Sequence, residues 1–105
     1  MIKVLKGCRR EIEGLPEEVR GDLADALARL DAGLVLTMPL SRPMTSIGRG
    51  AYELRLRDRS GTYRIVYALI HRGTVHVLHA FKKTTATTPA RNLDLAMKRL
   101  KEVQP

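Results

Sequence analysis

The side chains in this sequence that are best suited to chemistry are cations gathered in one region with a glutamate and a histidine. They are Glu53, Arg55, Arg64, His79, Lys82 and Lys83. Guanidinium and ammonium groups bind the oxygens of anions, and histidine is the side chain that exchanges a proton unaided near neutral pH. If the fold brings these residues together, they form a site for an anion with a proton carrier beside it.

The charge of the chain is concentrated in the same region. Residues 41–83 hold nine of the nineteen Lys and Arg residues but only two of the eleven acids, so this stretch carries a net charge of +7 out of a total of +8. Such regional charge indicates a polyanionic partner more strongly than a high isoelectric point does. We therefore expect residues 41–83 to face a polyanion.

The length and composition of the chain predict one domain spanning residues 1–105 in a reducing, cytoplasmic environment. A chain of this size can close one modest core without metals or disulfides. Cys8 is the single cysteine, and no apolar run is long enough for a secretory or membrane-spanning segment. His71 and His76 lack Cys or acidic partners at metal-ligand spacing, and phosphate-loop and dinucleotide motifs are absent, so we expect neither a metal nor a cofactor.

Hydrophobic spacing predicts an α+β protein whose helices cover one face of a small antiparallel sheet, in the order β-α-(α)-β-β-β-α. A helix is expected from Pro16 to Gly33, and another begins with Thr88 as N-cap and Pro89 in its first turn. Residues 34–50 are rich in proline and glycine, which predicts an irregular connection. Strands are expected at 2–6, 51–57, 62–70 and 74–81, with a short helical turn at 8–15.

The turns between the last three strands predict which side chains meet. A four-residue loop at 58–61 places Arg55 directly opposite Arg64, and a two-residue loop at 72–73 places Arg64 opposite Phe81. Alternation then gives a charged face of Glu53, Arg55, Arg57, Arg64, His79 and Phe81. The core face holds Tyr52, Leu54, Leu56, Tyr63, Ile65, Tyr67, Leu69, Leu78 and Ala80. Because like charges opposite one another repel, the charged face is unfavourable unless an anion occupies it.

These charged residues also have ordinary structural interpretations. An ion-pair network around Glu53 on a solvated surface accounts for Arg55 and Arg64 as well. His79 is equally explained as a half-buried strand histidine bonded to a neighbour, and the two adjacent lysines as solubilising charge at a strand end. The residue types alone leave these interpretations open.

Three strand strings and one helix start carry a resemblance to a known family. They are Tyr52-Glu53-Leu54-Arg55, Gly61-Thr62-Tyr63-Arg64-Ile65-Val66-Tyr67, Leu78-His79-Ala80-Phe81-Lys82-Lys83-Thr84 and Thr88-Pro89. Together they make residues 50–101 resemble the RelE superfamily of toxins, most closely the phage-derived HigB-like branch of type II toxin–antitoxin systems. Residues 1–49 are compatible with that family but hold no diagnostic motif.

The resemblance implies a RelE-like fold and a metal-independent endoribonuclease that enters the ribosome and cleaves messenger RNA during translation. In this chemistry the ribose 2′-hydroxyl attacks the adjacent phosphate, which leaves a cyclic phosphate and a free 5′-hydroxyl. The implied partners are the ribosome with its messenger RNA and a small HigA-like antitoxin with a helix-turn-helix module, with no membrane contact.

The resemblance also implies which residues act. Arg64 matches the strand arginine that holds the scissile phosphate. Glu53 stands where better-known relatives have a lysine, as a general base or as a clamp for Arg55 and Arg64, and His79 substitutes for a helix tyrosine that this chain lacks. The implied catalytic residues are Arg64, Arg55, His79, Glu53 and Lys83. The implied RNA-binding residues are Arg42, Arg49, Arg57, Lys82 and Thr84.

Two other functions fit the same fold. A ParE-like inhibitor of DNA gyrase does not need cations clustered on one face, whereas a non-catalytic nucleic-acid-binding module needs only the charge. The cluster of bases therefore favours a nuclease over a gyrase inhibitor, and it does not separate a nuclease from a simple binding module.

Overall fold

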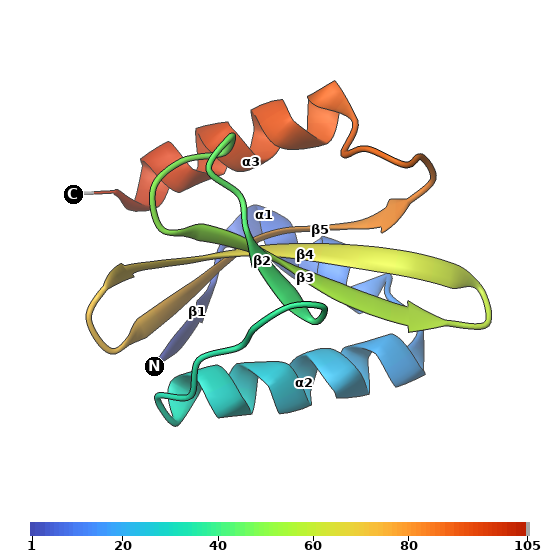
Figure 1. The fold of residues 1–105 in the computed structure, drawn as a ribbon, viewed down its shortest axis with the longest axis horizontal. Helices are drawn as coiled ribbons and strands as arrows, with labels where there is room; N and C mark the ends of the chain where they lie inside the picture. Colours follow the sequence, from blue (N-terminus) through green and yellow to red (C-terminus); the bar gives the residue numbers. More distant parts are fainter. Residues whose placement is uncertain (105) are drawn as a thin grey trace.

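The computed structural model describes residues 1–104 and shows a five-stranded mixed sheet with helices on both of its faces (Figure 1). The strand order across the sheet is β1-β5-β4-β3-β2. The α+β class expected from the sequence is confirmed. The elements are β1 (Ile2–Val4), α1 (Lys6–Glu13), α2 (Glu17–Asp31), β2 (Ser41–Pro43), β3 (Ala51–Asp58), β4 (Gly61–His71), β5 (Thr74–Lys83) and α3 (Ala90–Val103).

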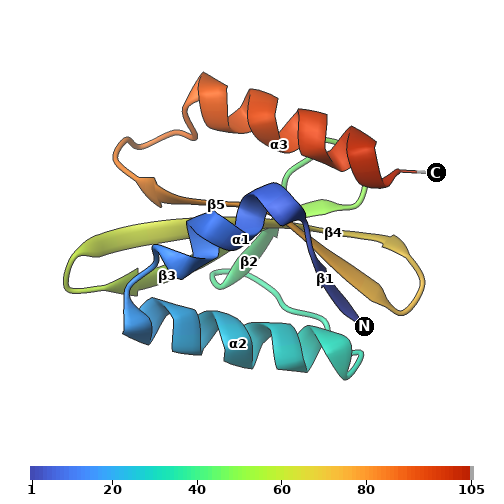
Figure 2. The same ribbon diagram turned by 180° about the vertical axis from the view of Figure 1, so that it is seen from behind.

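The helices lie on opposite sides of the sheet, so the expectation that they cover one face is wrong. Helix α2 packs below the sheet and α3 above it in Figure 1, and α1 lies in front of the strands in Figure 2, the view from behind. The reason lies in the second face, which is only half charged. Its other half carries Val66, Ala68 and Leu78, and these form a second core with Ala96 and Leu100 of α3. Apolar strand residues of this kind have to be covered, and α3 covers them.

The sheet is mixed rather than purely antiparallel, and it has one strand more than expected. Strand β1 pairs with β5 in parallel at one edge of the sheet. After β1, the two helices α1 and α2 lead to β2 at the opposite edge, and β3 and β4 bring the chain back to β5. Strand β2 lies within residues 34–50, which the sequence analysis expected to be irregular. It is only three residues long, and Pro43 is tolerated there because β2 is an edge strand.

The strand register that matters for the charged face agrees with the sequence-based expectation. Arg55 pairs with Arg64 across β3 and β4, and Arg64 pairs with Phe81 across β4 and β5. The pairing of β4 with β5 shifts by one residue between Ala68 and His71 and shifts back between Val66 and Tyr67. The partner of Arg64 is therefore the one that a two-residue turn predicts. The shift between Val66 and Tyr67 turns Leu78 toward α3. The expected position of Leu78, on the opposite face of the sheet, is therefore wrong.

Both long helices begin one residue later than expected, after a proline that acts as N-cap. Pro16 precedes α2 and Pro89 precedes α3, and neither helix start has a side-chain cap. Thr88, the expected N-cap of α3, instead donates a hydrogen bond from its hydroxyl to Glu53. Within residues 1–104, no helix combines the length and apolar character needed to cross a membrane.

Candidate functional site

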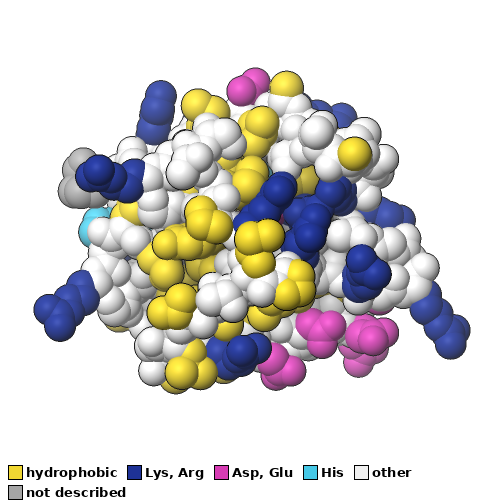
Figure 3. All heavy atoms as spheres, in the orientation of Figure 1, with side chains coloured by type: hydrophobic (Ala, Val, Ile, Leu, Met, Phe, Trp, Pro, Cys, Tyr) yellow, Lys and Arg dark blue, Asp and Glu magenta, His cyan; other side chains and the backbone are white. Residues whose placement is uncertain are grey.

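A groove opens where the ends of β3, β4 and β5 meet the chain that leads into α3. We call it the basic groove; its volume is about 670 Å³. Every charged side chain in its lining is a cation, and Figure 3 shows Lys and Arg side chains gathered on this side of the molecule. The lining residues are Pro39, Leu40, Arg55, Leu56, Arg57, Thr62, Arg64, Lys83, Thr84, Thr85 and Ala86.

Strand pairing places the cations of the groove side by side. Arg55 lies opposite Arg64, and Thr62 lies opposite Lys83 at the end of β5. Because side chains alternate along a strand, Arg57 shares the face of Arg55. Three adjacent strands thus deliver their positive charges to one hollow.

Arg64 lies at the buried end of this cluster. Its side chain is 1% exposed, and its Nη1 donates a hydrogen bond of 2.5 Å to Oε1 of Glu53. The Nε of Arg64 is buried without a hydrogen-bond partner among the described residues. A buried, unpartnered donor is unfavourable unless a ligand or water satisfies it. Glu53 therefore fixes one edge of the Arg64 guanidinium, while the Nε–H of Arg64 has no hydrogen-bond partner among the described residues.

Glu53 orients two arginines and one hydroxyl. Its Oε1 also accepts a bond of 3.2 Å from Arg42 Nη2, and its Oε2 accepts one of 3.3 Å from the Thr88 hydroxyl. The Glu53 side chain is fully buried and does not line the groove. The clamp that the sequence suggested for Arg55 and Arg64 thus holds Arg64 and Arg42, while Arg55 stays exposed.

The groove has more positive charge than Glu53, the one buried acid beside it, compensates. Burial lowers the pKa of Arg64, Glu53 opposes that shift and Arg55 adds to it. Burial also lowers the pKa of Lys83, and the charges of Arg64, Arg55 and Arg42 lower it further. These shifts identify a cluster of cations that an anion would stabilise.

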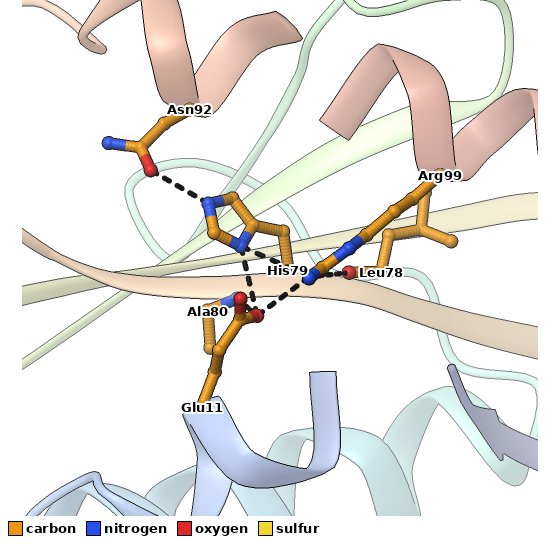
Figure 4. Close-up of polar contacts among 6 residues, drawn as sticks. All are labelled: Glu11, Leu78, His79, Ala80, Asn92 and Arg99. Carbon is orange, nitrogen blue, oxygen red and sulfur yellow. Dashed lines mark hydrogen bonds and ion pairs between the residues drawn. The ribbon is translucent and has the colours of Figure 1, made fainter. Parts of the chain in front are cut away.

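His79 lies outside the basic groove, in a second polar cluster that we call the Glu11 network (Figure 4). Its Nδ1 is 2.9 Å from Glu11 Oε1, and its Nε2 is 2.7 Å from Asn92 Oδ1. Arg99 Nη1 donates to the same Glu11 oxygen at 2.8 Å and to the Leu78 carbonyl at 2.9 Å. These bonds tie α1, β5 and α3 together.

The Glu11 network compensates its charges. Burial alone would raise the pKa of Glu11, but hydrogen bonds from Arg99, His79 and the Ala80 backbone N–H outweigh it and lower the pKa. His79 is 4% exposed and stacks on Phe81 with ring centroids 5.0 Å apart. Both of its ring nitrogens have partners, so this histidine is enclosed by protein.

Three of the expected RNA-binding residues lie away from the groove lining. Lys82 faces the other side of the sheet, with its Nζ 6.0 Å from the centre of the Tyr63 ring. Arg42 belongs to β2 and binds Glu53. Arg49 lies in the connection before β3 and is not among the residues that line the groove. Arg57 and Thr84 do line the groove.

Several residues of the site were not identified from the sequence. Strand alternation puts Thr62 on the same face of β4 as Arg64, so the place of Thr62 in the groove could have been predicted from the sequence. Leu40, Thr85 and the Glu53 contact of Thr88 depend on how the two connecting segments fold over the strands. Within residues 1–104, no three His, Cys, Asp or Glu side chains are grouped so that they could hold a metal ion.

The sequence matches one protein family over most of its length. The model of the family "Phage derived protein Gp49-like (DUF891)" matches residues 10–101. A comparison with curated protein sequences gave no match.

Solved structures of RelE share the fold. The isolated Escherichia coli RelE toxin is 20% identical, with a TM-score of 0.61 over 99% of this chain and 98% of that chain. A free RelE mutant with two arginines replaced by alanine is 16% identical, with a TM-score of 0.61 over 99% and 97%. A chain of the intact Escherichia coli RelBE toxin–antitoxin complex is 20% identical, with a TM-score of 0.50 over 81% of this chain and 98% of that chain. The RelE-like fold expected from the sequence is confirmed.

Proposed function

The chain belongs to the phage-derived Gp49-like family, and we propose that this member is the toxin of a type II toxin–antitoxin system that cleaves messenger RNA on the ribosome. One observation carries the proposal. On a RelE-like fold, the basic groove gathers Arg55, Arg57, Arg64 and Lys83 and no acid. A groove of this charge suits the phosphates of a polynucleotide.

The proposed reaction needs only the RNA, water and these side chains. The 2′-hydroxyl gives its proton to a water molecule and attacks the adjacent phosphorus, while the bond to the 5′-oxygen of the next nucleotide breaks and that oxygen takes up a proton. The products are a cyclic phosphate and a 5′-hydroxyl. Negative charge builds up on the phosphorus oxygens, and cations already fixed beside it stabilise that charge without reorganisation.

Arg64 is the residue proposed to hold the scissile phosphate. Glu53 fixes one end of its guanidinium, and the unpartnered Nε leaves a donor for a phosphate oxygen. Because Glu53 is fully buried and already accepts bonds from two arginines, its contacts favour the role of clamp over that of general base. Arg55 and Arg57, both exposed, are proposed to bind the flanking phosphates.

Lys83 is better placed than His79 to transfer a proton. It lines the groove, and burial together with neighbouring cations lowers the pKa of its ammonium group. An ammonium group with a lowered pKa is a stronger acid toward the departing 5′-oxygen. His79 is enclosed by Glu11 and Asn92, which favours a positioning role for it.

The proposed partners follow from the same charge. An antitoxin that neutralises this chain would cover the basic groove with acidic side chains, and a helix-turn-helix module of the HigA-like type remains a prediction. A RelE structure in complex with its antitoxin shares the fold of this chain, which supports an antitoxin as the partner. The HigB-like branch and the ribosome as the place of action are part of the proposal.

The test is to induce the chain in bacterial cells and map RNA 5′-hydroxyl ends. We expect growth arrest and cuts in step with the reading frame inside translated messages, and neither with Arg64→Ala. A matched control is Arg59→Ala, which removes an exposed turn arginine outside the groove. Growth arrest with DNA damage and no RNA cuts would contradict the proposal in favour of gyrase inhibition. No growth arrest and no cuts would leave a non-catalytic binding module.

A further inference from the structure

Two histidines take no part in the proposed function, and they meet beside a hollow of about 420 Å³ that we call the histidine hollow. Its polar lining consists of His71, His76, Lys3 and Lys6, and the rest of its lining is aliphatic. The hollow lies at the turn that joins β4 to β5, whereas the basic groove lies at the other end of the same two strands (Figure 1). The two hollows share no lining residue, so a ligand that binds here is independent of the groove.

The two imidazole rings are hydrogen-bonded to each other. Nδ1 of His71 lies 2.9 Å from Nε2 of His76, and the ring centroids are 5.1 Å apart. His76 is only 7% exposed, and His71 is half-buried. Within residues 1–104, the second nitrogen of each ring has no hydrogen-bond partner. Both of these nitrogens are therefore available to a ligand in the hollow.

The shared bond limits what the pair can offer to that ligand. A neutral imidazole has one N–H and one bare nitrogen, so a neutral pair presents one donor and one acceptor on its two remaining nitrogens. One added proton makes both remaining nitrogens donors and keeps the shared bond. Burial lowers the pKa of His76, and the neighbouring His71 and Lys3 lower it further, so an added proton is held weakly unless an anion compensates its charge.

The groups around the pair favour such an anion. Lys3 of β1 and Lys6 at the start of α1 line the hollow, α3 contributes only an aliphatic side chain, and none of the described lining residues is an acid. On its other side, His71 shares a smaller hollow with Arg72 and Asp31, and the Asp31 carboxylate is already paired with the N-terminal ammonium. An anion here meets two ammonium groups and, after proton uptake, two imidazole N–H donors.

We infer that the histidine hollow binds a phosphate group, and that the pair of His71 and His76 takes up one proton from solvent when the phosphate binds. The proton becomes an imidazole N–H, and both free ring nitrogens then donate to phosphate oxygens. Two ammonium groups and the protonated pair supply three positive charges, which suit a phosphate better than a single carboxylate. The aliphatic part of the lining can contact the organic portion of a phosphate ester.

The test follows the imidazole nitrogens of the full chain by NMR while sodium sulfate is added at constant ionic strength. Sulfate is a stand-in for phosphate that keeps its double charge between about pH 5 and pH 8, the range in which histidine titrates. We expect the resonances of His71 and His76 to move, and sulfate affinity to fall about tenfold per pH unit above the titration midpoint of the free pair. His79 is the internal reference and should not respond, because protein groups enclose both of its ring nitrogens.

A charge variant tests whether the lysines form part of the site. Lys3→Gln, Lys6→Gln should weaken sulfate binding at the two histidines by about tenfold or more, because it removes two of the three positive charges. The matched control is Lys98→Gln, Lys101→Gln, which removes the same charge from exposed positions of α3 outside the lining. Its sulfate affinity should stay at the wild-type value.

Uridine 5′-monophosphate and hexauridine then distinguish a free phosphate ester from a polynucleotide as the source of the phosphate, since the true source should move the two histidines at the lower concentration. Resonances of His71 and His76 that do not respond to sulfate would overturn the inference. Equal responses to sodium acetate, an affinity independent of pH, or wild-type affinity in Lys3→Gln, Lys6→Gln would overturn it as well. None of these outcomes bears on cleavage in the basic groove, which the mapping of RNA ends tests separately.

Discussion

The basic groove and the Glu11 network are built from the same parts, a glutamate with arginines beside a strand, yet their charges balance differently. In the Glu11 network, one carboxylate oxygen accepts bonds from Arg99, His79 and a backbone N–H. Around the groove, one buried carboxylate faces a larger number of cations. These are Arg42, Arg55, Arg57, Arg64 and Lys83.

The difference separates a structural role from a functional one. A compensated buried network holds elements together, and here it joins two helices to β5. An uncompensated set of cations destabilises the protein that carries it, through mutual repulsion and burial. Such a cost is typical of a site whose missing charge is supplied by a ligand. Substitutions in the two clusters should therefore affect different measurements.

The largest expected effect on activity is at Arg64. Arg64→Ala should lower cleavage of messenger RNA on purified ribosomes by about 100-fold to 1,000-fold, the range for losing one group that stabilises transition-state charge. Circular dichroism should accompany the assay, because the substitution leaves Glu53 with fewer partners. If Arg64→Ala does not fold, the double variant Arg64→Ala, Glu53→Gln also removes the negative charge that Glu53 would otherwise keep buried. It tests the loss of the same guanidinium group. Wild-type cleavage by a folded variant would contradict the assignment.

The next largest effect is expected at Lys83. Its neighbour Lys82 points to the opposite face of β5 and provides a matched control. Lys83→Arg should retain RNA binding but lower cleavage by about 100-fold, because arginine does not release a proton near neutral pH. With Lys83 as the acid, wild-type activity should fall as pH rises through a pKa below that of an ordinary lysine, and Lys83→Arg should lack this limb. Lys82→Arg, on the opposite face, should change neither the rate nor the pH profile. An unchanged profile in Lys83→Arg would exclude Lys83 as the acid.

The local pattern of the strands predicted the groove better than it predicted the Glu11 network. Alternation and turn length placed Arg55 opposite Arg64, because both are properties of a few adjacent residues. Glu11 is sixty-eight residues from His79 in sequence, so their contact depends on how α1 packs against β5. Nothing periodic in the chain marks that pair.

The placement of α3 was missed for a related reason. Charged residues in one half of a sheet face made the whole face look solvated, although its other half carries Val66 and Ala68. Which helix covers which face is decided by total apolar area, and strand alternation does not report it. Thr88 shows the same limit, because a sequence that suits an N-cap is used here to bond Glu53.

Substitutions in the Glu11 network should lower the stability of the protein and leave its cleavage of messenger RNA unchanged. Arg99→Ala removes the donor shared by Glu11 and the Leu78 carbonyl, so we expect the free energy of unfolding to fall by about 2 kcal/mol. Cleavage per folded molecule should remain at the wild-type value. Urea unfolding measures the first quantity and the ribosome assay the second. Arg91→Ala, on the exposed side of α3, should change neither. Loss of cleavage without loss of stability would place the network in the catalytic machinery.

The smallest expected effect is a pH dependence of stability that belongs to Glu11. Its pKa is lower in the folded protein than in the unfolded chain, because the bonds from Arg99 and His79 outweigh the effect of burial. A carboxylate of this kind contributes stability above the unfolded pKa, and that contribution disappears as pH falls through the folded pKa. The difference in unfolding free energy between wild type and Glu11→Gln should therefore be constant near neutral pH and shrink below about pH 4.5. A difference that stays constant down to low pH would show that Glu11 acts through packing, and the network would then no longer contrast with the groove in its use of charge.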